Sequence, residues 1–268
     1  MTNTNVDLSA TSNPQIVKNR IESQGFSIID LGFKNSLIQD MKEQLGKLVL
    51  EDLDKWDSNP FYRDHWMVMN LMFRKQIFAD LLGGENLQKF VEPLLGEPFI
   101  LYSFTSSSMP PNGTNFSRRI HNDAARFISN YITNVGLVIA LDDFTSENGA
   151  TLVLPYSQTL ETKPSDEDFA QNAIEILAKT GQGLIFNARL WHSGGQNKSQ
   201  NPRNALTLNF CRSFMRQHFD FSRMIDDLNG ISLNNQAKKL LGQRVRMPAS
   251  LEEYYVSTED RKYQPGQG

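Results

Sequence analysis

The stretch GQGLIFNARLWHSG, residues 181–194, indicates the fold class because it is a short apolar run bounded by turn residues. Gly181-Gln182-Gly183 is a turn signal, and the residues that follow it predict a β-strand. Similar runs lie between residues 97 and 214: EPFILYSFTSSSM, SRRIHND, NVGLVIALDD, GATLVLPYS and NALTLNFCRSF. We therefore predict a mainly β protein with flanking helices, a double-stranded β-helix (jelly-roll) barrel braced by N- and C-terminal α-helices.

The flanking segments carry helical patterns. Residues 13–25, NPQIVKNRIESQG, have a proline near their start and a glycine at their end, which is typical of a short helix. Residues 35–56 repeat apolar side chains at helical spacing. Residues 74–96, an insertion at 165–180, and residues 220–256 are also predicted to be helical.

The sequence predicts one folded unit. Residues 1–13 are polar and are expected to form a disordered tail. No linker rich in glycine, proline or serine divides residues 14–268, so we expect a single domain.

Composition excludes several partners. The net charge of −3 offers no basic excess for nucleic acid or an anionic membrane, and no apolar run reaches membrane-span length. The single cysteine, Cys211, excludes an internal disulfide and fits a reducing compartment. We therefore expect a cytoplasmic protein without nucleic-acid or membrane partners, and we leave a homodimer open.

Two histidines and a carboxylate form a candidate metal site. His121 precedes Asp123 by two residues, so in a strand both side chains would share a face. His192 lies at the end of another predicted strand, and adjacent strands would bring the three groups together. Such a set occupies one face of an octahedral metal and leaves three positions open, as in non-haem Fe(II) oxygenases. Arg203, eleven residues after His192, could hold a distal carboxylate there.

These residues resemble a known family. The run Trp191-His192-Ser193-Gly194-Gly195-Gln196-Asn197-Lys198-Ser199, followed by Arg203, resembles the second-histidine segment of the phytanoyl-CoA dioxygenase family. His121-Asn122-Asp123 matches that family's His-x-Asp motif. ENGATLVLPYSQ is similar to the strand that precedes the family's Pro-Gly-Ser-His motif. The resemblance spans roughly residues 98–212 and implies a cupin-like barrel.

The resemblance also implies the chemistry. Members depend on Fe(II), 2-oxoglutarate and O₂, so His121, Asp123 and His192 would be catalytic metal ligands, and Arg203 would bind the far carboxylate of 2-oxoglutarate. Succinate and CO₂ would be released. A retained Asp123 favours hydroxylation, or another oxidation such as desaturation or ring formation, over halogenation.

The chain departs from the family at two places. The Pro-Gly-Ser-His motif here reads Pro155-Tyr156-Ser157-Gln158, and Gly194 stands where a cosubstrate-binding hydroxyl often lies. Ser193, Thr105 and Ser107 are the candidates for further cosubstrate contacts.

The predicted substrate is a small, partly apolar molecule such as an amino acid derivative or a biosynthetic intermediate. His65 and His218 are expected to lie outside the metal site, and Cys211 is expected to be a buried strand residue. Candidate substrate contacts are Trp191, Arg118, Arg126 and Phe127. A non-catalytic metal-binding barrel and a zinc hydrolase are the alternative functions.

Overall fold

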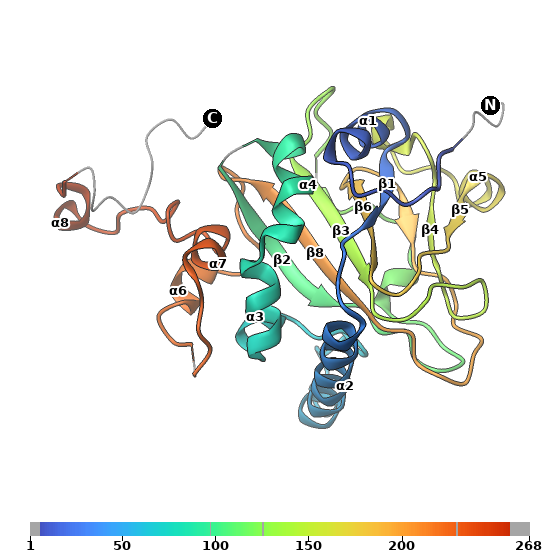
Figure 1. Ribbon diagram of the computed structural model, residues 1–268, viewed down its shortest axis with the longest axis horizontal. Helices are drawn as coiled ribbons and strands as arrows, with labels where there is room; N and C mark the ends of the chain where they lie inside the picture. The colour runs from blue at the N-terminus through green and yellow to red at the C-terminus, as the bar shows by residue number, and fades with distance from the viewer. Residues whose placement is uncertain (1–5, 97, 125, 229, 258–268) are drawn as a thin grey trace.

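A five-stranded antiparallel sheet forms the centre of the molecule (Figure 1). The computed structural model describes residues 6–96, 98–124, 126–228 and 230–257. The strands of this sheet lie in the order β1 (Phe26–Asp30), β6 (Gln182–Asn187), β3 (Asn134–Ala140), β8 (Ala205–Arg212) and β2 (Phe99–Ser106). A three-stranded sheet has the order β5 (Ile174–Ile176), β4 (Thr151–Val153) and β7 (His192–Ser193). Two antiparallel sheets with flanking helices confirm the predicted fold class.

Side chains alternate between the two faces of the large sheet along each strand, so one face packs in the core and the other lines a cavity. In β8, Leu206, Leu208 and Phe210 face a hydrophobic core shared with the N-terminal helices. Thr207 and Asn209 face the other way and line a cavity. One face therefore stabilises the fold, and the other is free to carry a site.

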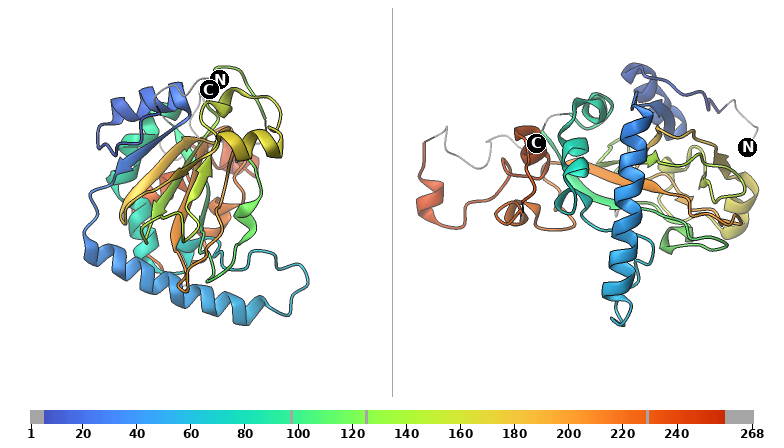
Figure 2. Two further views of the ribbon diagram at one scale, coloured as in Figure 1. Left: turned by 90° about the vertical axis from the view of Figure 1, so that its right-hand side faces the viewer. Right: turned by 60° about the horizontal axis from the view of Figure 1, so that its bottom comes forward.

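The helices pack on the outer face through regularly spaced apolar side chains. In α2 (Asn35–Trp56), Ile38, Met41, Leu45 and Leu48 are buried at intervals of three and four residues. The same core includes side chains of three further helices: α1 (Pro14–Gln24), α3 (Gln76–Gly83) and α4 (Glu85–Leu95). Figure 1 shows α3 and α4 in front of the sheet, and Figure 2 shows α2 extending along one edge of the molecule.

The segment before α1 differs from the expected disordered tail. Residues 1–5 lie outside the described residues. Thr11 forms backbone hydrogen bonds with Ile28 and Asp30 of β1, at 3.2 and 3.0 Å, and Asp7 forms an ion pair with Arg20. Residues 6–13 therefore lie against the body of the protein, because the edge strand β1 offers unpaired backbone groups that a polar segment can satisfy.

The other helices are short. The predicted helix at 165–180 is α5 (Asp166–Asn172) only, and the prediction is wrong for Ile174–Ile176, which pair with β4 as β5. The predicted helical tail contains α6 (Phe221–Met224), α7 (Asn235–Leu240) and α8 (Leu251–Tyr254). Single 3-10 turns occupy η1 (Leu71–Phe73), η2 (Phe116–Arg118) and η3 (Ser157–Thr159).

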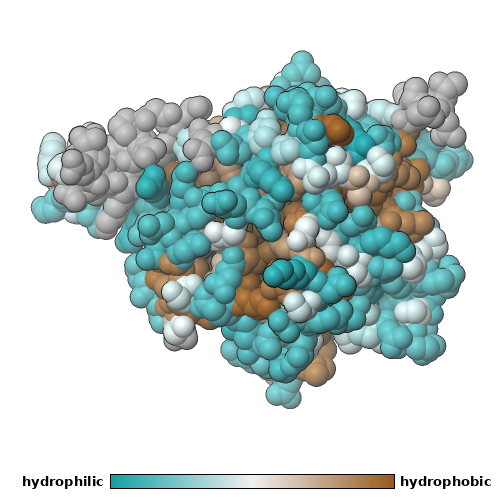
Figure 3. Space-filling model, in the orientation of Figure 1, coloured by the Kyte–Doolittle hydropathy of each residue, from teal (hydrophilic) through white to brown (hydrophobic). Residues whose placement is uncertain are grey.

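Polar side chains cover most of one face of the protein. Figure 3 shows a mainly hydrophilic face on which hydrophobic side chains gather in the middle. None of the helices in the described ranges has the length and apolar character that crossing a bilayer requires.

The N-cap of α1 can be tested by mutation. The Asn13 side chain accepts hydrogen bonds from the backbone of Gln15 and Ile16, at 2.9 and 3.4 Å, so Asn13→Ala removes an N-cap. We expect a loss of about 0.5–2 kcal/mol in the free energy of unfolding, measured by urea denaturation. Asn35→Ala, at an exposed residue without a capping bond, is the control and should leave the midpoint unchanged. Equal stability of both variants would contradict the capping role.

Candidate active site

His121 and His192 are held together by their own backbones. The His121 amide donates to the His192 carbonyl at 3.0 Å, and the His192 amide donates back at 2.9 Å. His192 belongs to β7, whereas His121 forms only this single bridge. The predicted strand over SRRIHND is therefore wrong, because Asp123 turns away and its amide donates instead to the Ala188 carbonyl at 2.7 Å. The same turn carries the Asp123 carboxylate to the two imidazoles.

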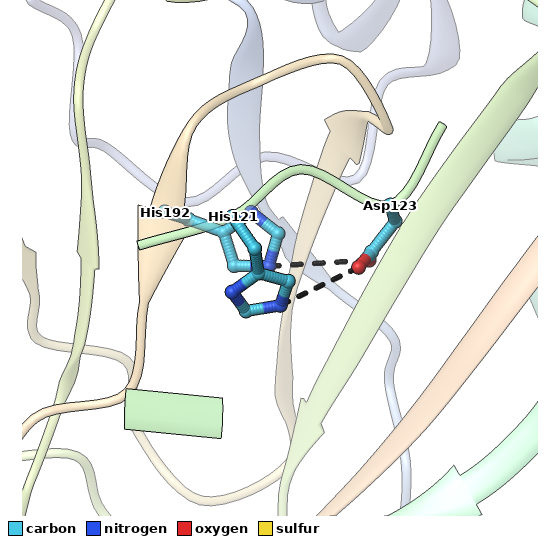
Figure 4. Close-up of side chains that lie close together, drawn as sticks. All are labelled: His121, Asp123 and His192. Atoms are coloured by element: carbon cyan, nitrogen blue, oxygen red, sulfur yellow. Dashed lines mark ion pairs between the residues drawn. The ribbon is translucent and has the colours of Figure 1, made fainter. Parts of the chain in front are cut away.

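The three side chains converge as a metal site requires (Figure 4). His121 Nε2 lies 3.5 Å from Asp123 Oδ1, and His192 Nε2 lies 3.9 Å from Asp123 Oδ2. One ligand atom from each residue lies within 4.8 Å of the others, and the imidazole centroids are 4.3 Å apart. Two nitrogens and one oxygen at this separation fit one face of an octahedral Fe(II) ion.

Backbone carbonyls fix the orientation of both imidazoles. His121 Nδ1 contacts the Arg119 carbonyl at 2.7 Å, and His192 Nδ1 contacts the Leu190 carbonyl at 2.9 Å. Because a carbonyl only accepts, each Nδ1 carries the proton and each Nε2 presents its lone pair toward Asp123. Burial, together with the charge of His192, lowers the pKa of His121 to about 4. The imidazole is therefore neutral at neutral pH, the form that binds a metal.

The triad lines a cavity of about 360 Å³ together with Arg203. Arg203 is only 2% exposed, and its Nε is buried without a hydrogen-bond partner. Its guanidinium lies 4.3 Å from the centroid of the Phe144 ring. Burial lowers the pKa of Arg203 to about 10, and the nearby Asp142 carboxylate opposes this, so the group stays charged at neutral pH. A buried cation with an unused donor suits an anionic ligand, and the far carboxylate of 2-oxoglutarate fits.

The other predicted cosubstrate residues divide into two groups. Thr105 and Ser107 line the cavity, and both are 8% exposed. Ser193 is buried but is absent from the lining formed by the described residues, because alternation along β7 points it away while His192 and Gly194 face inward. A side chain at Gly194 would overlap the Ser117 hydroxyl, which lines the cavity. Ser117 thus occupies the space in which the family hydroxyl was expected.

The four predicted substrate contacts lie elsewhere. Trp191 packs in a small buried cluster with Leu154 and Phe169, so it is a core residue. The remaining three, Arg118, Arg126 and Phe127, are also absent from the lining formed by the described residues; both arginines are exposed. Local sequence did not reveal which side of each loop faces the metal.

Residues missed by the sequence analysis supply much of the wall. Phe186, with its ring centroid 4.9 Å from that of His192, lines the cavity in place of Trp191, and Arg119 lines it in place of Arg118. Polar residues at alternate positions of β8, Thr207 and Asn209, were the available signal in an otherwise apolar strand.

The remaining histidines and the cysteine agree with the predictions. His65 is exposed, and its ring lies at a tilted angle to that of Tyr62, with centroids 4.6 Å apart. His218 stacks on Tyr102 and belongs to the cavity lining. Neither joins the metal-binding group found among the described residues. Cys211 is buried in β8, and burial raises the pKa of its thiol to about 12.

A jelly-roll-type sheet arrangement with two histidines and one carboxylate defines the class of non-haem iron oxygenases. The model of the phytanoyl-CoA dioxygenase family (PhyH) matches residues 21–205. The chain belongs to this family.

Individual relatives agree with the family assignment. The uncharacterized protein Rv1501 of Mycobacterium tuberculosis is 36% identical over 196 residues, which cover 71% of this chain and 72% of the relative. The dioxygenase trt7 of Aspergillus terreus is 23% identical over 259 residues, covering 87% of this chain and 85% of the relative.

Solved structures share the fold. EctD from S. alaskensis with bound Fe has a TM-score of 0.61 at 17% identity, over 74% of this chain and 76% of that one. HygX from Streptomyces hygroscopicus with nickel and 2-oxoglutarate bound has a TM-score of 0.57 at 15% identity, over 76% of this chain and 88% of that one.

Replacing any one of His121, Asp123 or His192 by alanine removes a ligand atom. We expect Mn(II) affinity, measured by isothermal titration calorimetry, to fall by more than about 100-fold, since loss of mere supporting groups costs 10–100-fold. His65→Ala is the matched control, because His65 is exposed and outside the cluster, and should bind as the wild type does. Wild-type affinity in the three ligand variants would contradict the site.

Proposed function

We propose that the protein is an Fe(II)- and 2-oxoglutarate-dependent dioxygenase that hydroxylates a small organic substrate and releases succinate and CO₂. The observation that carries the proposal is that the metal triad and the buried Arg203, whose Nε has no hydrogen-bond partner, share one cavity. A metal site alone would suit many functions. A cation placed for a distal carboxylate suits a dicarboxylate cosubstrate. We also propose a cytoplasmic location, consistent with a single, buried cysteine.

The residues of the cavity divide into metal ligands and cosubstrate contacts. His121, Asp123 and His192 would hold Fe(II) through three ligand atoms and leave three positions open. Iron with bound 2-oxoglutarate would supply O₂ activation and the oxidation of a substrate C–H bond. Arg203 would bind the far carboxylate by a charge-assisted hydrogen bond. Thr105 and Ser107, on the cavity wall, would add hydroxyl contacts.

The cavity also limits the substrate. A volume of about 360 Å³ lies toward the low end of the 300–1,000 Å³ range of small-molecule sites. Met67, Met69, Val138 and Phe186 give it an apolar wall that excludes water from the reacting groups. The substrate is therefore a small, partly apolar molecule.

Named relatives support this proposal. The relatives trt7 and af480, from Aspergillus terreus and Aspergillus fumigatus, are dioxygenases. EctD has been solved with 2-oxoglutarate and 5-hydroxyectoine, and HygX with 2-oxoglutarate. A desaturation or ring formation is the alternative reaction, and a non-catalytic metal-binding barrel is the alternative class. A non-catalytic barrel would leave the Arg203 Nε without an acceptor.

Anaerobic titration of the protein with Fe(II) and 2-oxoglutarate tests the proposal. We expect the weak visible charge-transfer band of the iron chelate. Arg203→Leu should weaken 2-oxoglutarate binding by about 2 kcal/mol or more, because it removes one member of a buried charge pair. Arg126→Ala, at an exposed arginine outside the cavity, is the control and should titrate as the wild type does.

A folded, Fe(II)-loaded wild type without the band would favour the non-catalytic barrel. Once a substrate is found, product mass separates the reactions. Hydroxylation adds one oxygen, whereas desaturation or ring formation removes two hydrogens.

A further inference from the structure

One row of the large sheet runs from the metal site across the cavity floor. Phe186 of β6 pairs with Gly136 of β3, Gly136 pairs with Asn209 of β8, and Asn209 pairs with Ser103 of β2. Residues paired across adjacent strands point to the same face. Phe186, Asn209 and Ser103 all line the cavity.

The metal end of this row is packed around a glycine. A Cβ at Gly136 would overlap the Phe186 ring, so the ring lies over the bare backbone of β3. Its other side contacts His192, with centroids 4.9 Å apart. The Phe186 ring therefore lies between the metal ligand His192 and Gly136, and the next side chain in the row is that of Asn209.

Asn209 is a buried residue whose side-chain oxygen, but not its side-chain nitrogen, has a hydrogen-bond partner among the described residues. It is 4% exposed, and its Oδ1 accepts a hydrogen bond from Asn134 Nδ2 at 3.0 Å. Asn134, on β3, is itself 2% exposed, so this bond fixes the Asn209 side chain. The Asn209 amide nitrogen donates to no other described residue and faces the cavity. A donor that lies on a cavity wall without a partner in the described chain favours a ligand with an acceptor.

Asn209 lies too far along β8 to serve the Arg203 end of the cavity. Asn209 is six positions after Arg203, and an extended chain rises about 3.3 Å per residue, so their Cα atoms lie about 20 Å apart. We infer that a five-carbon dicarboxylate held between the Arg203 guanidinium and the metal meets this row at its Phe186 end, beside His192, and stops short of Asn209. The Asn209 end of the row is therefore available to the substrate.

We propose that Asn209, oriented by Asn134 and paired with Ser103, is the specificity-determining contact that binds a carbonyl oxygen of the substrate. The inference rests on the proposed function and names its substrate class: a largely apolar ketone, ester or amide. The Asn209 amide donates to the carbonyl oxygen, while Phe186 and the methionines Met67 and Met69 contact the apolar remainder. Asn134 is a positioning residue, because it acts through Asn209.

Two simple probes of nearly the same shape test the proposal. Cyclohexanone carries the acceptor oxygen, and methylenecyclohexane replaces it by a CH₂ group. Protein loaded with Mn(II) and 2-oxoglutarate is titrated with each probe, and paramagnetic relaxation of the probe protons reports binding near the metal. We expect cyclohexanone to bind the wild type about tenfold more tightly, the worth of one hydrogen bond.

Asn209→Asp is the decisive variant. The carboxylate still accepts from Asn134, but an oxygen replaces the donor that faces the cavity, so the preference for cyclohexanone should disappear. Asn201→Asp adds the same charge at an exposed position and should keep the wild-type preference. Asn134→Leu should reduce the preference by freeing the Asn209 side chain. If Asn209→Asp fails to fold, Asn209→Ser serves as the second variant, with the same expected loss.

The outcomes separate this inference from the proposed function. A wild type without the Fe(II)–2-oxoglutarate band would defeat the proposed function. A normal band in wild type and Asn209→Asp, with the same probe preference in both, would overturn the role of Asn209 alone. So would a wild type that binds both probes equally.

Discussion

Two backbone hydrogen bonds between His121 and His192 are the constraint on which the candidate site depends. They join segments more than seventy residues apart in sequence and set the two imidazoles side by side. The Asp123 carboxylate is placed by a third bond, from its amide to Ala188. Because these bonds use backbone atoms, substitution of the ligand side chains should leave the local chain path intact, and the metal function is separable from the fold.

The large sheet separates stability from chemistry. Its outer face shares a hydrophobic core with helices from both ends of the chain, which supplies the apolar burial that stabilises the domain. Its inner face carries serine, threonine, asparagine and arginine side chains, several of them more than 90% buried. The cost of burying these groups is offset by the outer face, since the two faces belong to the same strands.

The sequence predicted the features that depend on neighbouring residues or on a regular spacing of residues along the chain. The α1 caps, the α2 periodicity, the two histidines with Asp123, and Arg203 were all visible as patterns. The errors have a common cause. Ser193 and Trp191 flank His192 in sequence but point away from it. Arg118 and Arg119 are both exposed, yet only Arg119 belongs to the cavity lining. Which side of a two-residue strand or a loop faces inward depends on distant partners, which no local pattern contains.

The buried cysteine bears on how the protein withstands oxidants. Cys211 is the only cysteine, and with a thiol pKa of about 12 it holds almost no thiolate at neutral pH. Oxidation of cysteine proceeds through the thiolate, so Cys211 is chemically inert despite its place in β8. Two sulfur atoms of the cavity lining belong instead to methionines, Met67 and Met69. Oxidative ageing of this protein should therefore appear as methionine sulfoxide, at Met247, which is 82% exposed, as well as at the cavity, and not as irreversible thiol damage.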